Sequence, residues 1–212
     1  MKDRNLCVVI AARNEAENID MVVKGASLWG DVVVVDNAST DRTKQIAWWA
    51  GASVIANKQD IHIRRSYIRG FEYALSQGYD QIVQLDAGLS FLAQDIDWLL
   101  TCEKSDLVIG GRPDFTRKLV SRLGGIATRT ITGMPFRDAT SGFRLWKADA
   151  LRRLNFDTLT CYAHGFQIEL LWQAWKAGMD IKTIPVHYTP GRTSANRAVA
   201  LEALRAIWRM RK

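Results

Sequence analysis

Two aspartates of this 212-residue chain stand at the ends of apolar runs, where a carboxylate can do chemistry. Asp36 closes the run 31–35, and Asp86 closes the run 81–85. Carboxylate oxygens bind hard divalent cations and accept hydrogen bonds from hydroxyl groups. One such acid could simply cap a following helix. Two acids at matching positions, each after a predicted strand, instead predict a ligand site.

Polar residues follow four of the predicted strands. Because ligands of an open parallel sheet collect beyond the carboxyl ends of its strands, we expect these four segments to line one site. They are Arg13-Asn14-Glu15, Asp36-Asn37-Ala38-Ser39, Asp86-Ala87-Gly88 and Gly110-Gly111-Arg112. The first segment lacks the glycine-rich fingerprint of dinucleotide-binding proteins, and the chain contains neither a P-loop nor a Gly-x-Ser-x-Gly turn. These absences argue against dehydrogenases, P-loop ATPases and α/β-hydrolases.

The elements that must position these residues alternate between strands and helices, which is typical of a mainly parallel α/β sheet flanked by helices. The unbroken valines at 32–35 suit a strand covered on both faces. Helical spacing also predicts that Trp48, Trp49, Trp172 and Trp175 pack in the core. The predicted strands are 6–11, 31–36, 52–55, 81–85, 107–109 and 181–186, and the predicted helices are 15–28, 41–50, 63–77, 95–103, 118–132, 166–177 and 198–210. No linker or repeat interrupts the chain, which predicts one domain over 1–212.

Charge is divided unevenly along the chain. The net charge is +7, but residues 1–100 carry 10 basic and 13 acidic side chains, whereas residues 101–212 carry 19 and 9. An acidic half joined to a basic half predicts a place for a cation and a place for anions. The basic residues are not interleaved with stacking aromatics, so we expect no nucleic-acid partner.

Compartment and membrane topology are also indicated by the sequence. Three widely spaced cysteines, Cys7, Cys102 and Cys161, predict reduced thiols in a cytoplasmic protein. No apolar run approaches the ~18–20 residues of a membrane-spanning helix, and we expect no leader peptide. The helix 198–210 is amphipathic and cationic, with Leu201, Leu204 and Trp208 on one side. It would either pack on the core or lie peripherally on the inner face of an anionic membrane.

Four motifs in order resemble a known family. Val8-Val9-Ile10-Ala11-Ala12-Arg13-Asn14-Glu15 is similar to the opening motif of glycosyltransferase family 2, and Val33-Val34-Val35-Asp36-Asn37-Ala38-Ser39-Thr40-Asp41 to its second motif. Arg137-Asp138-Ala139-Thr140-Ser141-Gly142-Phe143-Arg144 and Gly165-Phe166-Gln167-Ile168-Glu169 resemble the dolichyl-phosphate mannosyltransferase-like, or polyprenyl-phosphate glycosyltransferase, branch. The similarity extends from about Leu6 to Arg197, nearly the whole chain.

The resemblance implies a GT-A fold, a nucleotide-sugar donor of the GDP-mannose or UDP-glucose type, a Mg²⁺ or Mn²⁺ ion, and inversion at the sugar's anomeric carbon. Asp86 matches the metal acid, and Asp36 matches the acid that contacts the nucleoside. We expect Asp86, Asp138 and Arg144 to be catalytic. We expect the donor to be bound by Ala11, Arg13, Asn14, Glu15, Asp36, Asn37, Ser39, Asp86, Ala87 and Arg112. We expect the acceptor or its phosphate to be bound by Arg122, Ser141, Gly142, Arg144, Gln167, Glu169, His187 and Arg192.

The chain departs from the family pattern at three of these positions. Gly88 stands where the family has the second acid of its Asp-x-Asp motif, so a cation would depend on Asp86 with phosphate oxygens and water. Asn37 replaces the usual second aspartate, and Arg13 stands where many members have tyrosine. Both leave the base of the nucleotide open.

Three functions remain open from the sequence. A polyprenyl phosphate is already anionic at neutral pH, so it needs no strong base to accept a hexose. A saccharide hydroxyl would need a carboxylate base, for which Asp138 is the candidate. The missing metal acid also allows a nucleotide-sugar-binding homologue with weakened catalysis.

Overall fold

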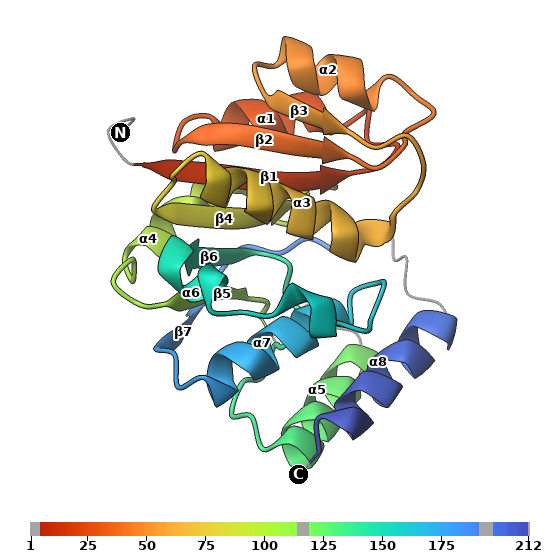
Figure 1. Ribbon diagram of the computed structural model, residues 1–212, viewed down its shortest axis with the longest axis vertical. Helices are drawn as coiled ribbons and strands as arrows, with labels where there is room; N and C mark the ends of the chain where they lie inside the picture. The colour runs from red at the N-terminus through yellow and green to blue at the C-terminus, as the bar shows by residue number, and fades with distance from the viewer. Residues whose placement is uncertain (1–4, 114–118, 191–196, 212) are drawn as a thin grey trace.

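The computed structural model describes residues 5–113, 119–190 and 197–211, while the side chains of 119–124, 127 and 197–200 lie outside the description. A seven-stranded sheet with the order β3-β2-β1-β4-β6-β5-β7 runs through the molecule (Figure 1). The strands are β1 (Leu6–Ala12), β2 (Asp31–Asp36), β3 (Ser53–Ala56), β4 (Gln81–Asp86), β5 (Leu107–Gly111), β6 (Arg144–Lys147) and β7 (Ile181–Pro185). All six predicted strands are present, with ends shifted by one or two residues.

The sheet is mainly parallel, which confirms the predicted fold class. Strand β1 pairs in parallel with both β2 and β4, and β5 pairs in parallel with β7. Strand β6 lies antiparallel between β4 and β5, where no strand is predicted from the sequence. Its four residues are too few to show a period, and their pairing partners lie some 60 and 40 residues away along the chain.

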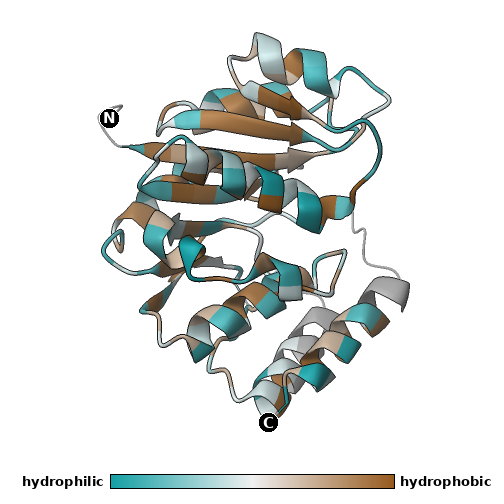
Figure 2. Ribbon diagram, in the orientation of Figure 1, coloured by the Kyte–Doolittle hydropathy of each residue, from teal (hydrophilic) through white to brown (hydrophobic). Residues whose placement is uncertain are grey.

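Both faces of the sheet are buried, as the valine run predicted. Val32 and Val34 of β2 face one core, whereas Val33 and Val35 face the other. In Figure 2 the central strands are brown, the colour of hydrophobic residues, while the outer helices carry more teal. Since successive side chains of a strand point to opposite faces, only an unbroken apolar run can fill two cores.

Helices cover the two faces in separate groups. Helices α1, α2 and α4 pack on one face with the 3-10 turn η1, and α3, α6 and α7 cover the other. The helices and 3-10 turns are α1 (Ile19–Ala26), α2 (Thr43–Trp49), α3 (His62–Ser76), η1 (Ala93–Asp95), α4 (Ile96–Leu100), α5 (Leu119–Thr132), α6 (Ala148–Arg152), η3 (Phe156–Thr158), α7 (Phe166–Lys176) and α8 (Arg197–Arg209).

Several helix predictions need correction. The predicted helix 15–28 begins only at Ile19, because Glu15 and its neighbours form the turn that leaves β1. The predicted helix 95–103 is a 3-10 turn followed by the five residues of α4. The prediction of a core position was wrong for Trp48 and Trp49, which are 66% and 61% exposed, whereas Trp172 and Trp175 do pack against the core.

Helix α3 approaches the sheet closely, which matters for the site. A Cβ at Gly70 would lie 2.2 Å from Val9 of β1, so only glycine fits at this crossing. One turn earlier on the same helix, Tyr67 is fully buried beneath the sheet. The short helix–sheet distance at Gly70 thus lets the Tyr67 side chain reach the end of β4.

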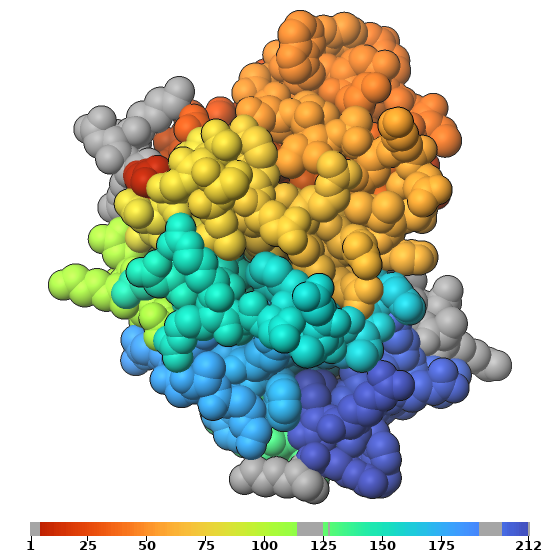
Figure 3. Space-filling model, viewed as in Figure 1, coloured from red at the N-terminus to blue at the C-terminus, as the bar shows by residue number. Residues whose placement is uncertain are grey.

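Helices α5 and α8 pack together at the end of the molecule farthest from α2 (Figure 1). Figure 3 shows α8, in dark blue, on the surface of this end. Ala206 and Ile207 of α8 and Met210 just after it are buried, while Leu204 and Trp208 are about half exposed. None of the helices in the described ranges is long and apolar enough to cross a bilayer.

Candidate active site

The two strand-end aspartates lie at the same edge of the sheet. Asp36 pairs in register with Ala12 of β1, and Ala11 pairs with Asp86 on the other side of that strand. Because neighbouring strands are about 4.8 Å apart, the two aspartate backbones are about 10 Å apart. This separation suits two different parts of one extended ligand.

Asp36 has an acceptor that the protein leaves unused. The residue is 3% exposed, and its Oδ2 accepts a hydrogen bond from the backbone N–H of Ser39 at 3.2 Å. Its Oδ1 is buried and has no hydrogen-bond partner among the residues that the structure describes. A buried carboxylate oxygen without a donor is unfavourable, so a ligand hydroxyl or N–H group would stabilise it.

The loops after β1 and β2 are tied to each other. The backbone N–H of Asn14 donates to Ser39 Oγ at 3.0 Å, and the Asn14 side chain accepts from the N–H of Thr40 at 2.8 Å. Asn14 has a left-handed backbone with a φ of 55°, which asparagine tolerates better than most residues. The Glu15 N–H donates to Thr43 Oγ1 at 2.8 Å, which fixes the loop on α2.

A second network lies beside Asp36. The Asn37 side-chain amide donates to Asp60 at 2.7 Å, and Arg13 forms an ion pair with the same carboxylate. A cavity of about 360 Å³ opens here, with Asp36, Asn57, Lys44 and Lys58 among its lining residues. Arg13 and Asn37, two of the departures from the family pattern, are therefore joined through Asp60.

Helix α3 contacts Asp86 through the side chain of Tyr67. The Tyr67 hydroxyl lies 2.8 Å from Asp86 Oδ1 and 3.0 Å from the backbone carbonyl of Leu85. Burial, and then the negative charge of Asp86, raise the pKa of Tyr67 well above its usual value of 10, so the hydroxyl stays protonated and can donate. On the other side, a Cβ at Gly142 would lie only 2.7 Å from Asp86 Oδ2.

Arg112 and Asp138 form a buried ion pair next to this aspartate. Nε and Nη2 of Arg112 donate to the two carboxylate oxygens of Asp138 at 2.7 and 2.5 Å, and the Arg112 backbone N–H donates at 3.0 Å. Thr140 Oγ1 accepts a further bond at 2.5 Å, and the ring of Tyr188 lies 5.4 Å from the guanidinium carbon. Burial disfavours the arginine charge, but the bonds and charge of Asp138 outweigh it and raise the pKa of Arg112.

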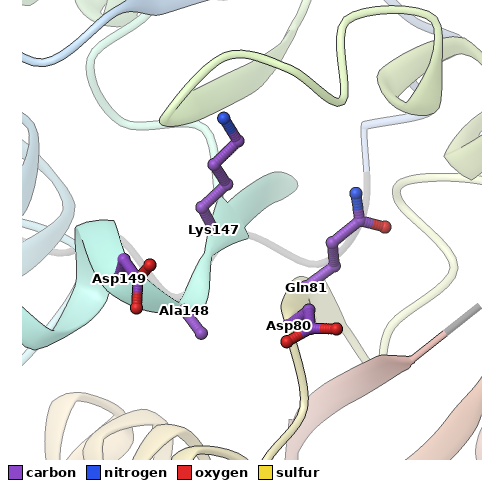
Figure 4. A pocket seen from close by; sticks show the side chains of 5 residues that line it. All are labelled: Asp80, Gln81, Lys147, Ala148 and Asp149. Atoms are coloured by element: carbon purple, nitrogen blue, oxygen red, sulfur yellow. The ribbon is translucent and has the colours of Figure 1, made fainter.

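The cavity in Figure 4 lies at the other edge of the sheet and carries no part of this site. Its volume is about 340 Å³, and its lining residues are Asp80, Gln81, Lys147, Ala148 and Asp149. Gln81 begins β4, the strand that Asp86 ends. Because ligands of such sheets bind at the carboxyl edge, we assign this cavity no role.

Comparison with known proteins agrees with the geometry. No protein-family model matches the chain. An undecaprenyl-phosphate mannosyltransferase of Micrococcus luteus is 29% identical over 202 residues, covering 85% of this chain and 82% of that protein. A polyprenol monophosphomannose synthase of Mycolicibacterium smegmatis is 26% identical over 205 residues, covering 86% and 76%. Both similarities support the polyprenyl-phosphate branch of glycosyltransferase family 2, which the sequence motifs resemble.

A solved structure supports the GT-A fold that the sequence predicts. Glucosyl-3-phosphoglycerate synthase of Mycobacterium tuberculosis, in complex with Mn²⁺ and UDP-glucose, superposes with a TM-score of 0.74. The match covers 97% of this chain and 77% of that chain at 22% sequence identity. At that identity the likeness shows the fold.

Three polar residues expected at the acceptor side are buried. Arg144 is fully buried, and its guanidinium donates to the backbone carbonyls of Ser141, Ala139 and Gln167 at 2.9–3.0 Å. The Glu169 carboxylate accepts from the N–H groups of 160 and 161, and the Gln167 side chain is 1% exposed. Arg144 Nη1 and Gln167 Oε1 have no partner among the described residues, so contact of these residues with substrate stays a prediction.

The remaining expected residues divide between the site and its surroundings. Ser141 is buried and donates to the Gly110 carbonyl at 2.6 Å, which fixes the segment beside Asp86. His187 faces η1 and α4, with its ring nitrogen 2.9 Å from Asp95 and its ring 4.9 Å from that of Trp98. The Arg122 side chain and the whole of Arg192 lie outside the described residues.

Four residues of the site are not among those expected from the sequence. Tyr67, Asp60, Thr140 and Tyr188 each contact an expected site residue. Thr140 lies within a quoted motif, so the motif itself could have indicated it. The other three carry no local signal, because their partners are 19, 23 and 76 residues away along the chain.

Proposed function

We propose that this family 2 glycosyltransferase moves a hexose from a nucleotide sugar to a polyprenyl phosphate with inversion at the anomeric carbon. The names of the two bacterial relatives support a lipid-phosphate acceptor. The acceptor assignment rests on the hydrogen bonds of Asp138, since both of its carboxylate oxygens accept bonds from Arg112.

A hydroxyl acceptor would need a carboxylate free to take its proton. Asp138 is 4% exposed and would have to release Arg112 to act in this way. A phosphate monoester has a second pKa near ~6 and is largely a dianion at neutral pH, so it needs no such base. The fixed positive charge of Arg112 suits an anionic acceptor or the diphosphate of the donor.

The donor side of the proposal rests on Asp36. Its unpartnered Oδ1 is an acceptor for a hydroxyl of the nucleoside ribose, and the cavity beside it has room for part of a nucleoside. The Arg13–Asp60–Asn37 network borders the place where a base would lie. We infer that this network, rather than Asp36 itself, selects the base.

The residues at Asp86 fit a divalent cation. Tyr67 donates to one carboxylate oxygen of Asp86, and the absence of a side chain at Gly142 makes room for the carboxylate. No group of three or more His, Cys, Asp or Glu that could hold a metal occurs in the described part of the chain. That composition agrees with Mg²⁺ or Mn²⁺ bound by few carboxylates together with diphosphate oxygens and water. Such an ion would neutralise the charge that develops on the leaving diphosphate.

The transfer itself is a single displacement. An acceptor phosphate oxygen forms a bond to the anomeric carbon while the bond from that carbon to the donor diphosphate breaks, and the nucleoside diphosphate leaves with the electron pair. Attack from the face opposite the leaving group inverts the configuration. Arg112 supplies a positive charge whose position is set by Asp138 and Thr140, so the site reorganises little during the reaction.

The test is transfer of radiolabelled hexose from GDP-mannose or UDP-glucose to a polyprenyl phosphate in the presence of Mg²⁺ or Mn²⁺. We expect label in the lipid phase with wild-type protein and with the Asp97→Asn control, whose aspartate is exposed on α4. We expect none with Asp86→Asn. Label in a free saccharide with none in the lipid would refute the acceptor assignment.

We also propose that α8 lies on an anionic membrane surface, where a lipid-linked acceptor would be presented. Leu201, Leu204 and Trp208 are 53%, 49% and 57% exposed, and Arg205 and Arg209 are exposed between them. Ile126 of the neighbouring α5 adds a further exposed apolar side chain. An amphipathic cationic helix of this kind binds through its apolar area and its attraction to anionic lipids.

Sedimentation with vesicles that contain phosphatidylglycerol tests this surface. Leu204→Glu should weaken binding, whereas Leu28→Glu, which changes an equally exposed leucine near α1, should not. Replacing Arg205 with Gln should weaken binding about fivefold, since each basic residue near such a surface contributes about 1 kcal/mol. Equal binding by all four proteins would contradict a role of α8.

A further inference from the structure

We propose that Glu15, on the loop after β1, supplies the second carboxylate of the cation site that Gly88 leaves without a local acid. The inference rests on the proposed use of a divalent cation at Asp86. The family resemblance places the second acid of the cation site at position 88, on the loop after β4. The inference assigns that negative charge to Glu15, on the loop after β1, and so explains how a cation can bind where β4 ends with a single acid.

The Glu15 carboxylate occupies the space in front of Gly88. A Cβ built on Gly88 would lie 3.6 Å from Glu15 Oε1 and 4.0 Å from Oε2. A side chain at position 88 would therefore project toward the Glu15 carboxylate. The glycine is in an ordinary backbone conformation, so it is not required there by strain. The charge that an aspartate would carry at 88 is thus already present, delivered from the neighbouring loop.

The Glu15 side chain is positioned by bonds that leave one oxygen for a ligand. Its backbone N–H is fixed by Thr43 Oγ1 at 2.8 Å, and its carbonyl accepts from the N–H groups of 18 and 19. Its Oε2 accepts from the Asn18 amide at 3.0 Å. Among the described residues no donor is found for Oε1, the oxygen nearer to Gly88.

The Asp86 carboxylate is arranged in a similar way to that of Glu15. Tyr67 donates to Oδ1 of Asp86, and Oδ2 faces Gly142, where a side chain is absent. Each acid therefore has one oxygen that accepts a hydrogen bond from the protein, and each carboxylate lies against a glycine. Two carboxylates from different loops, each with a free oxygen, match the small protein share of a Mg²⁺ or Mn²⁺ shell completed by phosphate and water.

The alternative is that Glu15 only closes its own turn through Asn18. Moving the negative charge from position 15 to position 88 distinguishes binding of a cation by Glu15 from closure of its own turn. Glu15→Gln keeps a side-chain acceptor for Asn18 but removes the charge, and Gly88→Asp in the same protein returns a carboxylate to the site from the other loop. A Cβ at position 88 would lie 3.6 Å from Glu15 Oε1, which is an ordinary contact, so the added aspartate should be tolerated.

The measurement is Mn²⁺ binding followed by electron paramagnetic resonance, alone and with GDP or UDP, without any acceptor. We expect Glu15→Gln to weaken Mn²⁺ binding about 10- to 100-fold, and the double variant Glu15→Gln, Gly88→Asp to recover most of that loss. Glu72→Gln, which removes an exposed charge on α3, should bind Mn²⁺ like the wild type.

Unchanged Mn²⁺ affinity in Glu15→Gln would overturn the inference, as would a loss that Gly88→Asp fails to recover while thermal unfolding shows an intact fold. Wild-type protein that binds no Mn²⁺ with either nucleotide would overturn it as well. None of these readouts involves a lipid acceptor, so failure of hexose transfer to polyprenyl phosphate would reject the proposed function independently.

Discussion

Replacing Asp138 with asparagine tests whether this residue anchors Arg112 or acts as a base. Asparagine keeps the shape and one acceptor oxygen, but it removes the charge opposite a buried guanidinium. In the wild-type protein the carboxylate accepts three bonds from Arg112, two from the side chain and one from the backbone. The pair is well shielded, since the side chains of Arg112 and Asp138 are only 14% and 3% exposed.

The magnitude follows from that burial. Removing one partner of a buried ion pair costs about 3–5 kcal/mol, because the remaining charge is left without compensation. The retained amide oxygen and Thr140 still accept from Arg112, so we expect a loss near the lower limit, about 3 kcal/mol. For a chain of this size each kcal/mol corresponds to about 2–4 °C, so the melting temperature should fall by about 6–12 °C.

The assay combines thermal unfolding with the pH dependence of transfer. An anchoring role predicts the fall in melting temperature, a raised KM for the phosphate acceptor, and a pH profile whose shape is that of the wild type. A base role predicts a small change in melting temperature, an unchanged KM and the loss of the acidic limb of the kcat profile. The second pattern would refute the anchoring argument and favour a hydroxyl acceptor.

Four further predictions follow, two from the contacts of Asp86 and two from the buried thiols. Gly142→Ala should lower transfer more than tenfold with a melting temperature close to that of the wild type, because its Cβ would displace the Asp86 carboxylate, which lies 2.7 Å from that position. Gly88→Ala is the control, since its Cβ would make only an ordinary contact. Equal transfer activities of the two variants would contradict this prediction. Tyr67→Phe should destabilise the fold by about 1.5–3 kcal/mol and reduce Mn²⁺ binding, whereas Tyr79→Phe, which loses a 2.7 Å bond to Asp31 at the other edge, should leave Mn²⁺ binding intact. Burial, aided by Asp31 and Glu169 respectively, raises the pKa of Cys7 and Cys161 from 9 to about 12, so in native protein at pH 8 a thiol reagent should modify Cys102 alone. Because these pKa values are raised in the folded protein, the contribution of the two neutral thiols to the free energy of unfolding is fully present below pH 9 and is lost as the pH rises toward 12. Alkaline unfolding measures this loss.

The edge of the sheet that carries the site could be predicted because its signals are local. The valine run of β2 is continuous, as a strand buried on both faces requires, and β4 before Asp86 is apolar except at Gln81 and Gln84. Once those strands are parallel, Asp36 and Asp86 must lie at one edge, as the register through Ala11 and Ala12 confirms. Their chemical roles are still predictions.

The partners of the expected residues could not be predicted, because each partner comes from a distant part of the chain. Asp138 has the residue type of a base, and only the fold reveals that Arg112 occupies it. Arg144 has the residue type of a phosphate ligand, and only the fold reveals that its guanidinium is enclosed by backbone carbonyls. Residue type indicates what a side chain can do, whereas packing decides whether it is free to do it.

The segment that leads into strand β6 contacts both sides of the proposed site. Because β6 runs antiparallel between β4 and β5, the segment 138–142 that leads into it lies between the ends of those two strands. The beginning of that segment holds Arg112, and its end at Gly142 abuts Asp86. Arg144, the first residue of β6, fastens the same segment from behind through the carbonyls of Ala139 and Ser141. Burial lowers the pKa of Arg144 to about 9, so at neutral pH it still adds a positive charge behind both acids. A single buried arginine thereby sets the spacing between the carboxylate proposed to hold the cation and the guanidinium proposed to meet the phosphate.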